Sequence, residues 1–226
     1  SYYQLKILVR ALARYFNDCY SDVKALHEPK PSRIMRIASN LRLANKIKSS
    51  TLNSLLVLSR RKILNHNQCN IYVETNPFLY GFIKELDEIF KDVKIVHITR
   101  HPATYIRSYI NFGVFRGIKG LVGANLPYWL LKPEHISDTS PKRWKAMTHF
   151  ERIAWYWATI NSELDTGETL LCERYLRIKF EDLFEEENHG FEKLAKWIGL
   201  DTNAIQFKNE IKNKIHASQD HGLPPV

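Results

Sequence analysis

The sequence contains few of the residues that mark disordered or disulfide-linked proteins. Among 226 residues there are nine glycines, nine prolines and three cysteines, whereas hydrophobic residues make up 44%. Such a composition excludes a collagen-like or low-complexity chain. The cysteines, Cys19, Cys69 and Cys172, are far apart and odd in number, which favours neither a disulfide framework nor a zinc site. We therefore expect a globular protein of a reducing, cytoplasmic compartment.

Long hydrophobic runs are also missing. Charged residues interrupt every apolar stretch well before the roughly 18 residues that a membrane-spanning helix needs. The first residues, Ser1-Tyr2-Tyr3-Gln4, have neither the basic flank nor the apolar core of a signal peptide. No internal repeat or domain boundary is visible, and the length is ample for one sizeable core. We expect a single domain over residues 1–226, without a transmembrane segment.

Acidic residues are scarce in the first third of the chain. Residues 1–70 hold 13 Lys and Arg against three acids, a balance of +10, whereas residues 71–226 hold 20 against 21, a balance of −1. Such a basic region favours an anionic partner, such as nucleic acid, a membrane surface, a polyanionic sugar or a phosphate-bearing cofactor. A solvated basic helix face explains the same charge, so charge alone does not decide between them.

The spacing of apolar residues predicts alternating strands and helices. Strands are expected at 23–26, 71–73, 94–99 and 175–180, and helices at 2–16, in two segments of 33–64, after Asn76-Pro77, from Pro102 to near Gly113, and at 145–164, 189–198 and 201–214. Residues 114–143, with several Gly and Pro, predict a long loop or lid. Strand, helix, strand and helix at this spacing imply a parallel sheet, and hence an α/β domain.

One candidate ligand site follows the strand at 94–99. In open parallel sheets, ligands sit beyond the carboxyl ends of the strands, near the start of the next helix. Arg100 falls at this junction, and Ser108 lies two turns into the helix that begins at Pro102. A guanidinium fork and a hydroxyl could clamp one phosphate, although an arginine at a strand end also forms structural salt bridges.

Four segments resemble the sulfotransferase family in the correct order. KIVHITRHPATYIRSYINFG (94–113) is similar to the family's 3′-phosphate-binding segment, with Arg100, Pro102 and Ser108 at the matching positions and His101 where an acid is common. Three further segments look like segments of the family. They are the strand and helix that lead to this motif (72–100), the aromatic helix (150–164), and the late strand with its closing helix, YLRIKFEDLFEEENHGFEKLAKWIGL (175–200). The resemblance covers roughly residues 71–200.

The resemblance implies a three-layer α/β/α fold with a central parallel sheet, like that of P-loop nucleotide transferases. It implies sulfuryl transfer from 3′-phosphoadenosine 5′-phosphosulfate (PAPS) to a hydroxyl or amine of a small molecule or glycan, without metal or nucleic acid. Arg100 and Ser108 would hold the 3′-phosphate. Two features depart from the family: the loop that binds the 5′-phosphosulfate is missing, and its usual strand-end lysine is Thr75. We expect an N-terminally truncated chain, and a shortened C-terminus remains open.

Sulfuryl transfer needs a base that deprotonates the acceptor. Some family members place a glutamate just after the second strand, in a position resembling His27-Glu28-Pro29. Glu28 is therefore the first candidate, although it could simply pair with Lys24 or Lys30. Glu74 is the second candidate, unless it caps a helix or anchors an arginine. His27 is the third, since a loop histidine is usually just solvated.

Two other functions remain open at this stage. The basic region 1–70 could make the chain a non-catalytic polyanion-binding module, whose binding would weaken steeply with salt. A P-loop-type kinase would share the fold, but the sequence has neither a Walker-A loop nor a clear Walker-B acid. The histidines show no metal-ligand spacing. The sequence does not identify the acceptor or the oligomeric state.

Overall fold

The computed structural model describes residues 2–64, 70–113, 117–136, 141–184 and 189–202. Its elements are α1 (Tyr2–Cys19), β1 (Val23–His27), α2 (Ser32–Leu43), α3 (Ser49–Leu64), β2 (Ile71–Thr75), η1 (Tyr80–Phe82), α4 (Ile83–Ile89), β3 (Ile95–Thr99), α5 (Pro102–Phe112), α6 (Gly117–Asn125), α7 (Pro133–Ile136), α8 (Pro141–Ala146), α9 (His149–Leu171), η2 (Cys172–Arg174), β4 (Tyr175–Lys179), η3 (Asp182–Phe184) and α10 (His189–Ile198). Within these ranges, no helix combines the length and the hydropathy that a membrane span requires.

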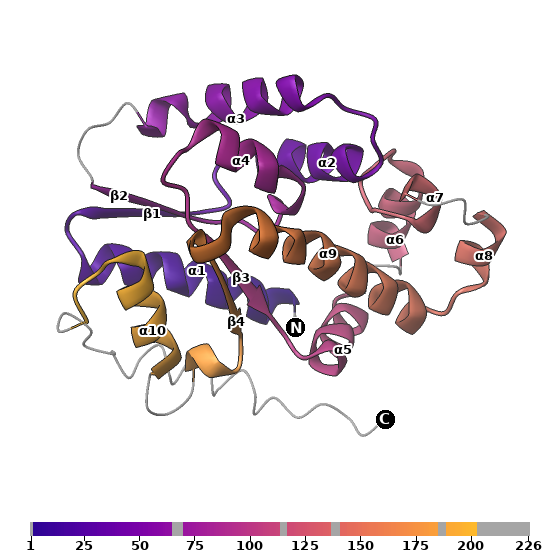
Figure 1. Cartoon of the computed structure of the whole chain (residues 1–226). Helices are drawn as coiled ribbons and strands as arrows, with labels where there is room; N and C mark the ends of the chain where they lie inside the picture. Colours follow the sequence, from indigo (N-terminus) through magenta and orange to yellow (C-terminus); the bar gives the residue numbers. More distant parts are fainter. Residues whose placement is uncertain (1, 65–69, 114–116, 137–140, 185–188, 203–226) are drawn as a thin grey trace.

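The strands form parallel pairs, as the strand and helix order predicts. β1 pairs with β2, with His27 opposite Thr75, and β3 pairs with β4, with Thr99 opposite Lys179. The hydrogen bonds join the strands in these two pairs rather than in one continuous ladder. Helices cover both faces: α2, α3 and α4 lie above the strands in Figure 1, and α1 and α10 lie below. The α/β fold with parallel sheets is therefore confirmed.

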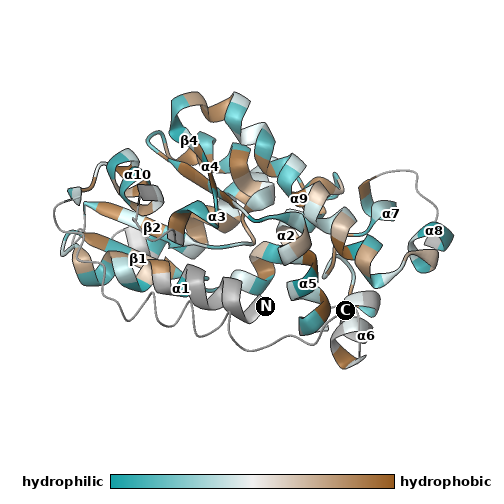
Figure 2. Ribbon diagram, turned by 90° about the horizontal axis from the view of Figure 1, so that it is seen from below, coloured by the Kyte–Doolittle hydropathy of each residue, from teal (hydrophilic) through white to brown (hydrophobic). Residues whose placement is uncertain are grey.

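Both strand pairs contribute to one hydrophobic core beneath them. The amphipathic helix α1 buries Phe16 against Phe191 of α10, with ring centroids 5.6 Å apart. Strand residues from both pairs, including Val23 and Ile178, belong to the same cluster. Figure 2 shows the strands mainly in brown, while the helices alternate between brown and teal, as expected for elements with one buried face. This shared core fixes the two pairs relative to each other.

A side-chain clamp aligns α1 with β1. The amide of Asn17 donates through Nδ2 to the carbonyl of Ala25, and its Oδ1 accepts from the Ala25 N–H, both at 2.8 Å. A buried backbone N–H and C=O that would otherwise lack partners on this strand edge are thereby satisfied. The clamp therefore determines where β1 ends along α1, and with it the position of the residues that follow β1.

The helix predicted to begin at Asn76-Pro77 begins later. Asn76 Oδ1 accepts from the Phe78 N–H at 3.0 Å, which closes a local turn, and regular helix starts only with η1 and α4. Side chains of asparagine compete in this way with helical hydrogen bonds. The prediction of an N-cap at Asn76 was therefore wrong, whereas the helical character of the following segment is confirmed.

Gly81 explains why the chain after β2 is irregular. A Cβ atom at this position would lie 2.7 Å from Cα of Ser39 in α2, which is closer than real Cβ contacts allow. Only glycine permits this approach of two backbones. The turn after β2 is thus packed directly on α2.

Other predicted boundaries differ to varying degrees. The two helices expected within 33–64 are α2 and α3, and the helix expected at 145–164 is α9, which runs from His149 to Leu171. The loop predicted at 114–143 contains helices α6 and α7 and the start of α8 in its described part. The Gly and Pro residues and the weak periodicity of this segment predict no helix, so the short helices are a correction of that prediction. The helix predicted at 201–214 lies almost entirely outside the described residues.

A buried histidine joins β3 to α9. His97 is 2% exposed; its Nδ1 lies 2.7 Å from the Tyr175 hydroxyl and its Nε2 lies 3.0 Å from Asn161 Oδ1. Burial lowers the pKa of His97, while the hydrogen bond with Asn161 and the charge of Asp165 act in the opposite direction. The neutral imidazole is therefore the form that the fold favours.

We expect stability to fall as the pH is lowered through the ordinary pKa of histidine. Because the pKa of His97 is lower in the folded chain, the unfolded chain binds more protons below about pH 6.5, and protonation favours unfolding. The loss approaches about 1.4 kcal/mol per pH unit for one such group. Urea unfolding at about pH 7.5 and about pH 5.5 measures it. In His97→Gln the free energy of unfolding should depend less steeply on pH. An unchanged dependence would contradict the assignment of this effect to His97.

Candidate active site

The candidate residues lie at the carboxyl ends of the parallel strands. His27 ends β1 beside Thr75 of β2, and Glu28 follows directly. Arg100 follows β3, and Phe180 follows β4 on the neighbouring strand. The carboxyl ends of such strands are where α/β proteins bind ligands. The sequence-predicted residues thus form two groups, one at the end of each strand pair.

Arg100 is packed on an aromatic ring rather than on an acid. Its guanidinium carbon lies 4.9 Å from the centroid of the Phe180 ring, and its buried Nε has no hydrogen-bond partner within the described ranges. Burial lowers the pKa of Arg100, and the charge of Glu181 acts in the opposite direction. Even so, an arginine remains charged at neutral pH. The stacking leaves its N–H groups available to an anion, so the salt bridge considered above is not what positions it.

Ser108 contributes a second polar atom from α5. The side chain is 5% exposed, and its hydroxyl oxygen has no hydrogen-bond partner in the described part of the chain. His101 caps the start of this helix, because its ring accepts a hydrogen bond from the Ala103 N–H. Pro102 is the first residue of the helix. Gly113 ends it in a left-handed conformation with φ of 69°. A buried hydroxyl without a partner is uncommon and marks a group that a ligand can satisfy.

Glu28 and His27 form the second group. Their side chains are 11% and 9% exposed, with His27 Nε2 3.7 Å from Glu28 Oε1. His27 Nδ1 lies 3.1 Å from the hydroxyl of Thr75, which fixes the ring. Glu28 itself has a positive φ of 44°, a left-handed conformation that costs a non-glycine residue roughly 1–2 kcal/mol. Strained backbone of this kind concentrates at functional sites.

Glu74 is engaged in a bidentate ion pair. Nε and Nη2 of Arg60, a residue of α3 that is 2% exposed, donate to the two carboxylate oxygens at 2.6 Å each. The Tyr72 hydroxyl and the Asn76 amide also donate to this carboxylate, at 3.0 and 2.8 Å. Among the roles considered for Glu74, this geometry supports the one in which it anchors an arginine. A carboxylate with four donors is poorly suited to accept a proton.

The described residues contain no group of three or more His, Cys, Asp or Glu side chains that could hold a metal ion. The polar groups at the strand ends are instead the donors of Arg100 and Ser108 and the separate carboxylates of Glu28 and Glu74. Arg100 and Ser108 suit an anion such as a phosphate, and Glu28 suits a proton acceptor.

Comparison with known protein families matches the Sulfotransferase family over residues 9–204. The match covers most of the chain, including all four strands and both groups of candidate residues. This chain belongs to the sulfotransferase family. The family resemblance stated from the sequence is thereby confirmed, and the protein is a transferase. Comparisons with curated proteins and with solved structures found no match.

Two residues of this sulfotransferase site were missed by sequence reasoning. Phe180, the platform for Arg100, directly follows β4, so its place beside β3 could have been deduced from the predicted strand order. Arg60, the partner of Glu74, stands in a predicted basic helix with nothing to distinguish it from its neighbours. Its role depends on a contact that only the folded chain creates.

Some basic residues of region 1–70 form ion pairs or aromatic contacts within this sulfotransferase. Besides Arg60, Arg42 pairs with Glu85 at 3.1 Å. The guanidinium of Arg36 lies 4.8 Å from the ring centroid of Trp129 and 5.4 Å from that of Phe78. Other basic residues of this region lie at the surface, including Arg10, Arg14 and Arg33, so internal contacts account for only part of the excess charge.

Proposed function

We propose that this sulfotransferase uses PAPS as donor and transfers its sulfuryl group to a hydroxyl or amine acceptor. The observation that carries the proposal is the pair of buried polar atoms, Arg100 Nε and Ser108 Oγ, that lack hydrogen-bond partners in the described part of the chain. They belong to the two residues expected from the family resemblance to bind the 3′-phosphate. Orphaned donors beyond a strand end and on the next helix fit an anionic group.

Arg100 supplies the positive charge for the 3′-phosphate. A planar guanidinium can donate two parallel hydrogen bonds to phosphate oxygens, and Arg100 Nε has no hydrogen-bond partner within the described residues. Ser108 adds a hydroxyl donor from α5. The pair binds the donor nucleotide away from the reacting sulfur, so its contribution is to affinity and orientation.

Glu28 acts as the base. The acceptor atom attacks sulfur as its proton passes to the Glu28 carboxylate, the bond between sulfur and the bridging oxygen of the 5′-phosphate breaks, and 3′-phosphoadenosine 5′-phosphate leaves. The side chain is 11% exposed, which combines access to an acceptor with partial removal from water. His27 positions Glu28, because its ring is fixed by Thr75 on one side and faces the carboxylate on the other.

Two other functions compete with this one. A polyanion-binding module is favoured by the exposed basic residues of 1–70, among them Arg10, Arg14 and Arg33, although Arg36, Arg42 and Arg60 make internal contacts. Such a module would not need Arg100, and its binding would weaken steeply with salt. A P-loop-type kinase would need phosphate-binding and magnesium-binding motifs that the sequence does not show, and the family match favours sulfuryl rather than phosphoryl transfer.

Release of 3′-phosphoadenosine 5′-phosphate from PAPS tests the proposal. The probes are 2-naphthol as a phenol, a primary alkylamine, and an unsulfated glycosaminoglycan as a glycan. We expect release to depend on one of these acceptors and to yield its sulfated product in equal amount. Acceptor-independent release, or no release from protein that binds the product nucleotide, would contradict the transfer reaction.

A further inference from the structure

A cavity separate from the candidate active site lies among the helices that cover the upper face of the sheets in Figure 1. It has a volume of about 290 Å³ and opens between α2, α4 and α9. Its polar wall includes Arg42, Glu85 and Glu163, and its apolar wall includes Ile83 and Leu170. None of the candidate active-site residues lines it. What it binds is therefore a separate question from the transfer reaction.

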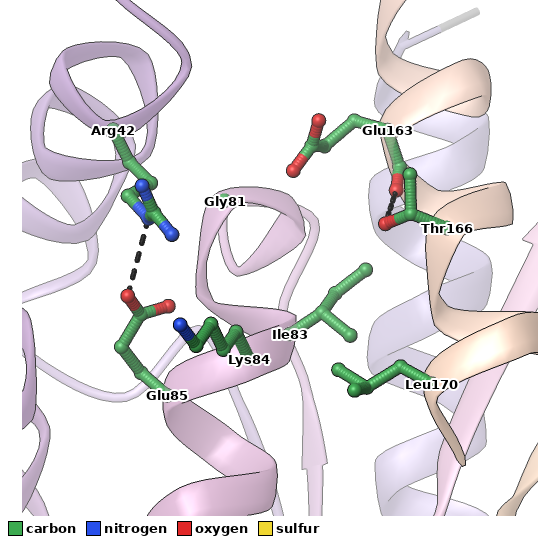
Figure 3. A pocket seen from close by; sticks show the side chains of 8 residues that line it. All are labelled: Arg42, Gly81, Ile83, Lys84, Glu85, Glu163, Thr166 and Leu170. Atoms are coloured by element: carbon green, nitrogen blue, oxygen red, sulfur yellow. Dashed lines mark hydrogen bonds and ion pairs between the residues drawn. The ribbon is translucent and has the colours of Figure 1, made fainter. Parts of the chain in front are cut away.

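Glu85 carries an unsatisfied oxygen in the wall of this cavity. The residue is 0% exposed. Its Oε1 accepts from the Ser49 hydroxyl at 2.7 Å and pairs with Arg42 Nε at 3.1 Å. Its Oε2 is buried and has no hydrogen-bond partner within the described residues. In Figure 3 this second oxygen points away from Arg42, toward the space between α4 and α9. A buried charged acceptor without a hydrogen-bond donor is destabilising. A ligand that supplies a donor to this oxygen would remove that cost.

Glu163 faces the same space from α9. Figure 3 shows its carboxylate projecting from the helix toward the side of the cavity formed by Arg42 and Gly81. Burial raises the pKa of Glu163; Arg42 acts in the opposite direction, and Glu85 raises the pKa further. The coupling to both residues means that the three charged groups are close enough to interact. In the described part of the chain, no hydrogen bond or ion pair reaches the Glu163 carboxylate.

The cavity lining carries two basic side chains, Arg42 and Lys84, and two acidic ones, Glu85 and Glu163. Arg42 pairs with Glu85. Lys84 is 59% exposed in its side chain and pairs with Glu88 at 3.7 Å, outside the lining. Three carboxylates therefore share two cations, and Glu163 is the one without an ion pair within the described residues. A divalent metal ion would need more oxygen ligands than two carboxylates provide.

We propose that this cavity binds a primary alkylammonium group, with the ammonium between Glu85 Oε2 and the Glu163 carboxylate and the alkyl chain on Ile83 and Leu170. An ammonium has three donors and no acceptor, which matches Glu85 Oε2 and the Glu163 carboxylate, since neither accepts a hydrogen bond within the described residues. Leu170 is 44% exposed and lies beside Ile83 in Figure 3, so an alkyl chain laid on them would be removed from water.

Titration with butylammonium chloride, followed by amide NMR shifts and matched with sodium chloride, tests this site. We expect saturable shifts at Gly81, Glu163 and Thr166. Glu163→Gln should weaken binding by about tenfold or more, since it removes the charge of this carboxylate. Glu168→Gln is the matched control, because Glu168 is an exposed residue of the same helix that does not line the cavity, and it should bind as the unchanged protein does.

A second comparison examines the apolar wall without altering charge. Butylammonium should bind more tightly than methylammonium, and Leu170→Ala should reduce this difference. Shifts that sodium chloride reproduces, equal binding by Glu163→Gln, or equal affinity for both amines would each overturn the proposal. The titration needs no donor nucleotide, so its result is independent of whether the chain uses PAPS.

Discussion

Replacement of Arg100 by alanine is expected to weaken binding of 3′-phosphoadenosine 5′-phosphate by about two to three orders of magnitude. Truncating one partner of a desolvated, hydrogen-bonded charge pair costs about 2–5 kcal/mol. Arg100 fits this case because it is partly buried on the Phe180 ring and its Nε has no hydrogen-bond partner within the described residues. Arg100→Lys should recover only part of the affinity, since a lysine keeps the charge but not the planar fork. Calorimetric titration measures both.

Arg107→Ala is the control for this experiment. Arg107 lies on the same helix but is exposed, so its removal changes the net charge equally without touching the proposed phosphate site. Its dissociation constant should stay within about twofold of the unchanged protein, as expected for an exposed charge. If both variants lost the same affinity, the effect of Arg100 would be one of overall charge, and the assignment of the 3′-phosphate site would be wrong.

Glu28→Gln is expected to lower kcat by about two to four orders of magnitude while leaving the affinity for the nucleotide unchanged. Removal of a general base typically has an effect of this size. Glutamine keeps the size of the side chain and its hydrogen-bonding reach beside His27, so the loss reports on proton transfer. Steady-state rates with whichever probe acceptor is sulfated, together with nucleotide titration, separate the two quantities. His27→Gln should cause a smaller decrease, because His27 acts through Glu28.

Glu173→Gln is the matched control for the base. Glu173 is an exposed residue of η2, which precedes the amino end of β4, so it lies at the opposite end of the strands from Glu28. This variant should keep the full kcat. A Glu28→Gln variant with full kcat would assign the base elsewhere.

Local patterns in the sequence were sufficient to predict the elements that carry Arg100 and Ser108, the residues of the proposed nucleotide site. The apolar run at 94–99, Pro102 near the start of the helix and Gly113 at its end predicted β3 and α5 closely, because strand periodicity, proline and glycine act locally. Arg100 and Ser108 followed from their places on these elements. The parallel pairing of the strands also followed from their order along the chain.

Contacts between distant parts of the chain could not be predicted in this way. Arg60 and Glu74 belong to different elements, and only folding places the guanidinium against the carboxylate. The close approach of Gly81 to Ser39 of α2 also joins parts of the chain that no local pattern relates. The opposition of Glu85 and Glu163 across a cavity likewise arises from the packing of α4 beside α9. In each case the deciding energy comes from a tertiary contact.

The most direct test of the proposed donor is a calorimetric comparison of 3′-phosphoadenosine 5′-phosphate with adenosine 5′-phosphate on the unchanged chain. The two ligands differ only in the 3′-phosphate, which is the group assigned to Arg100 and Ser108. We expect the first to bind about a hundredfold or more tightly than the second, in line with the loss of a charged hydrogen-bonded group. Equal affinity for both, or no binding of either, would contradict the use of PAPS by this sulfotransferase.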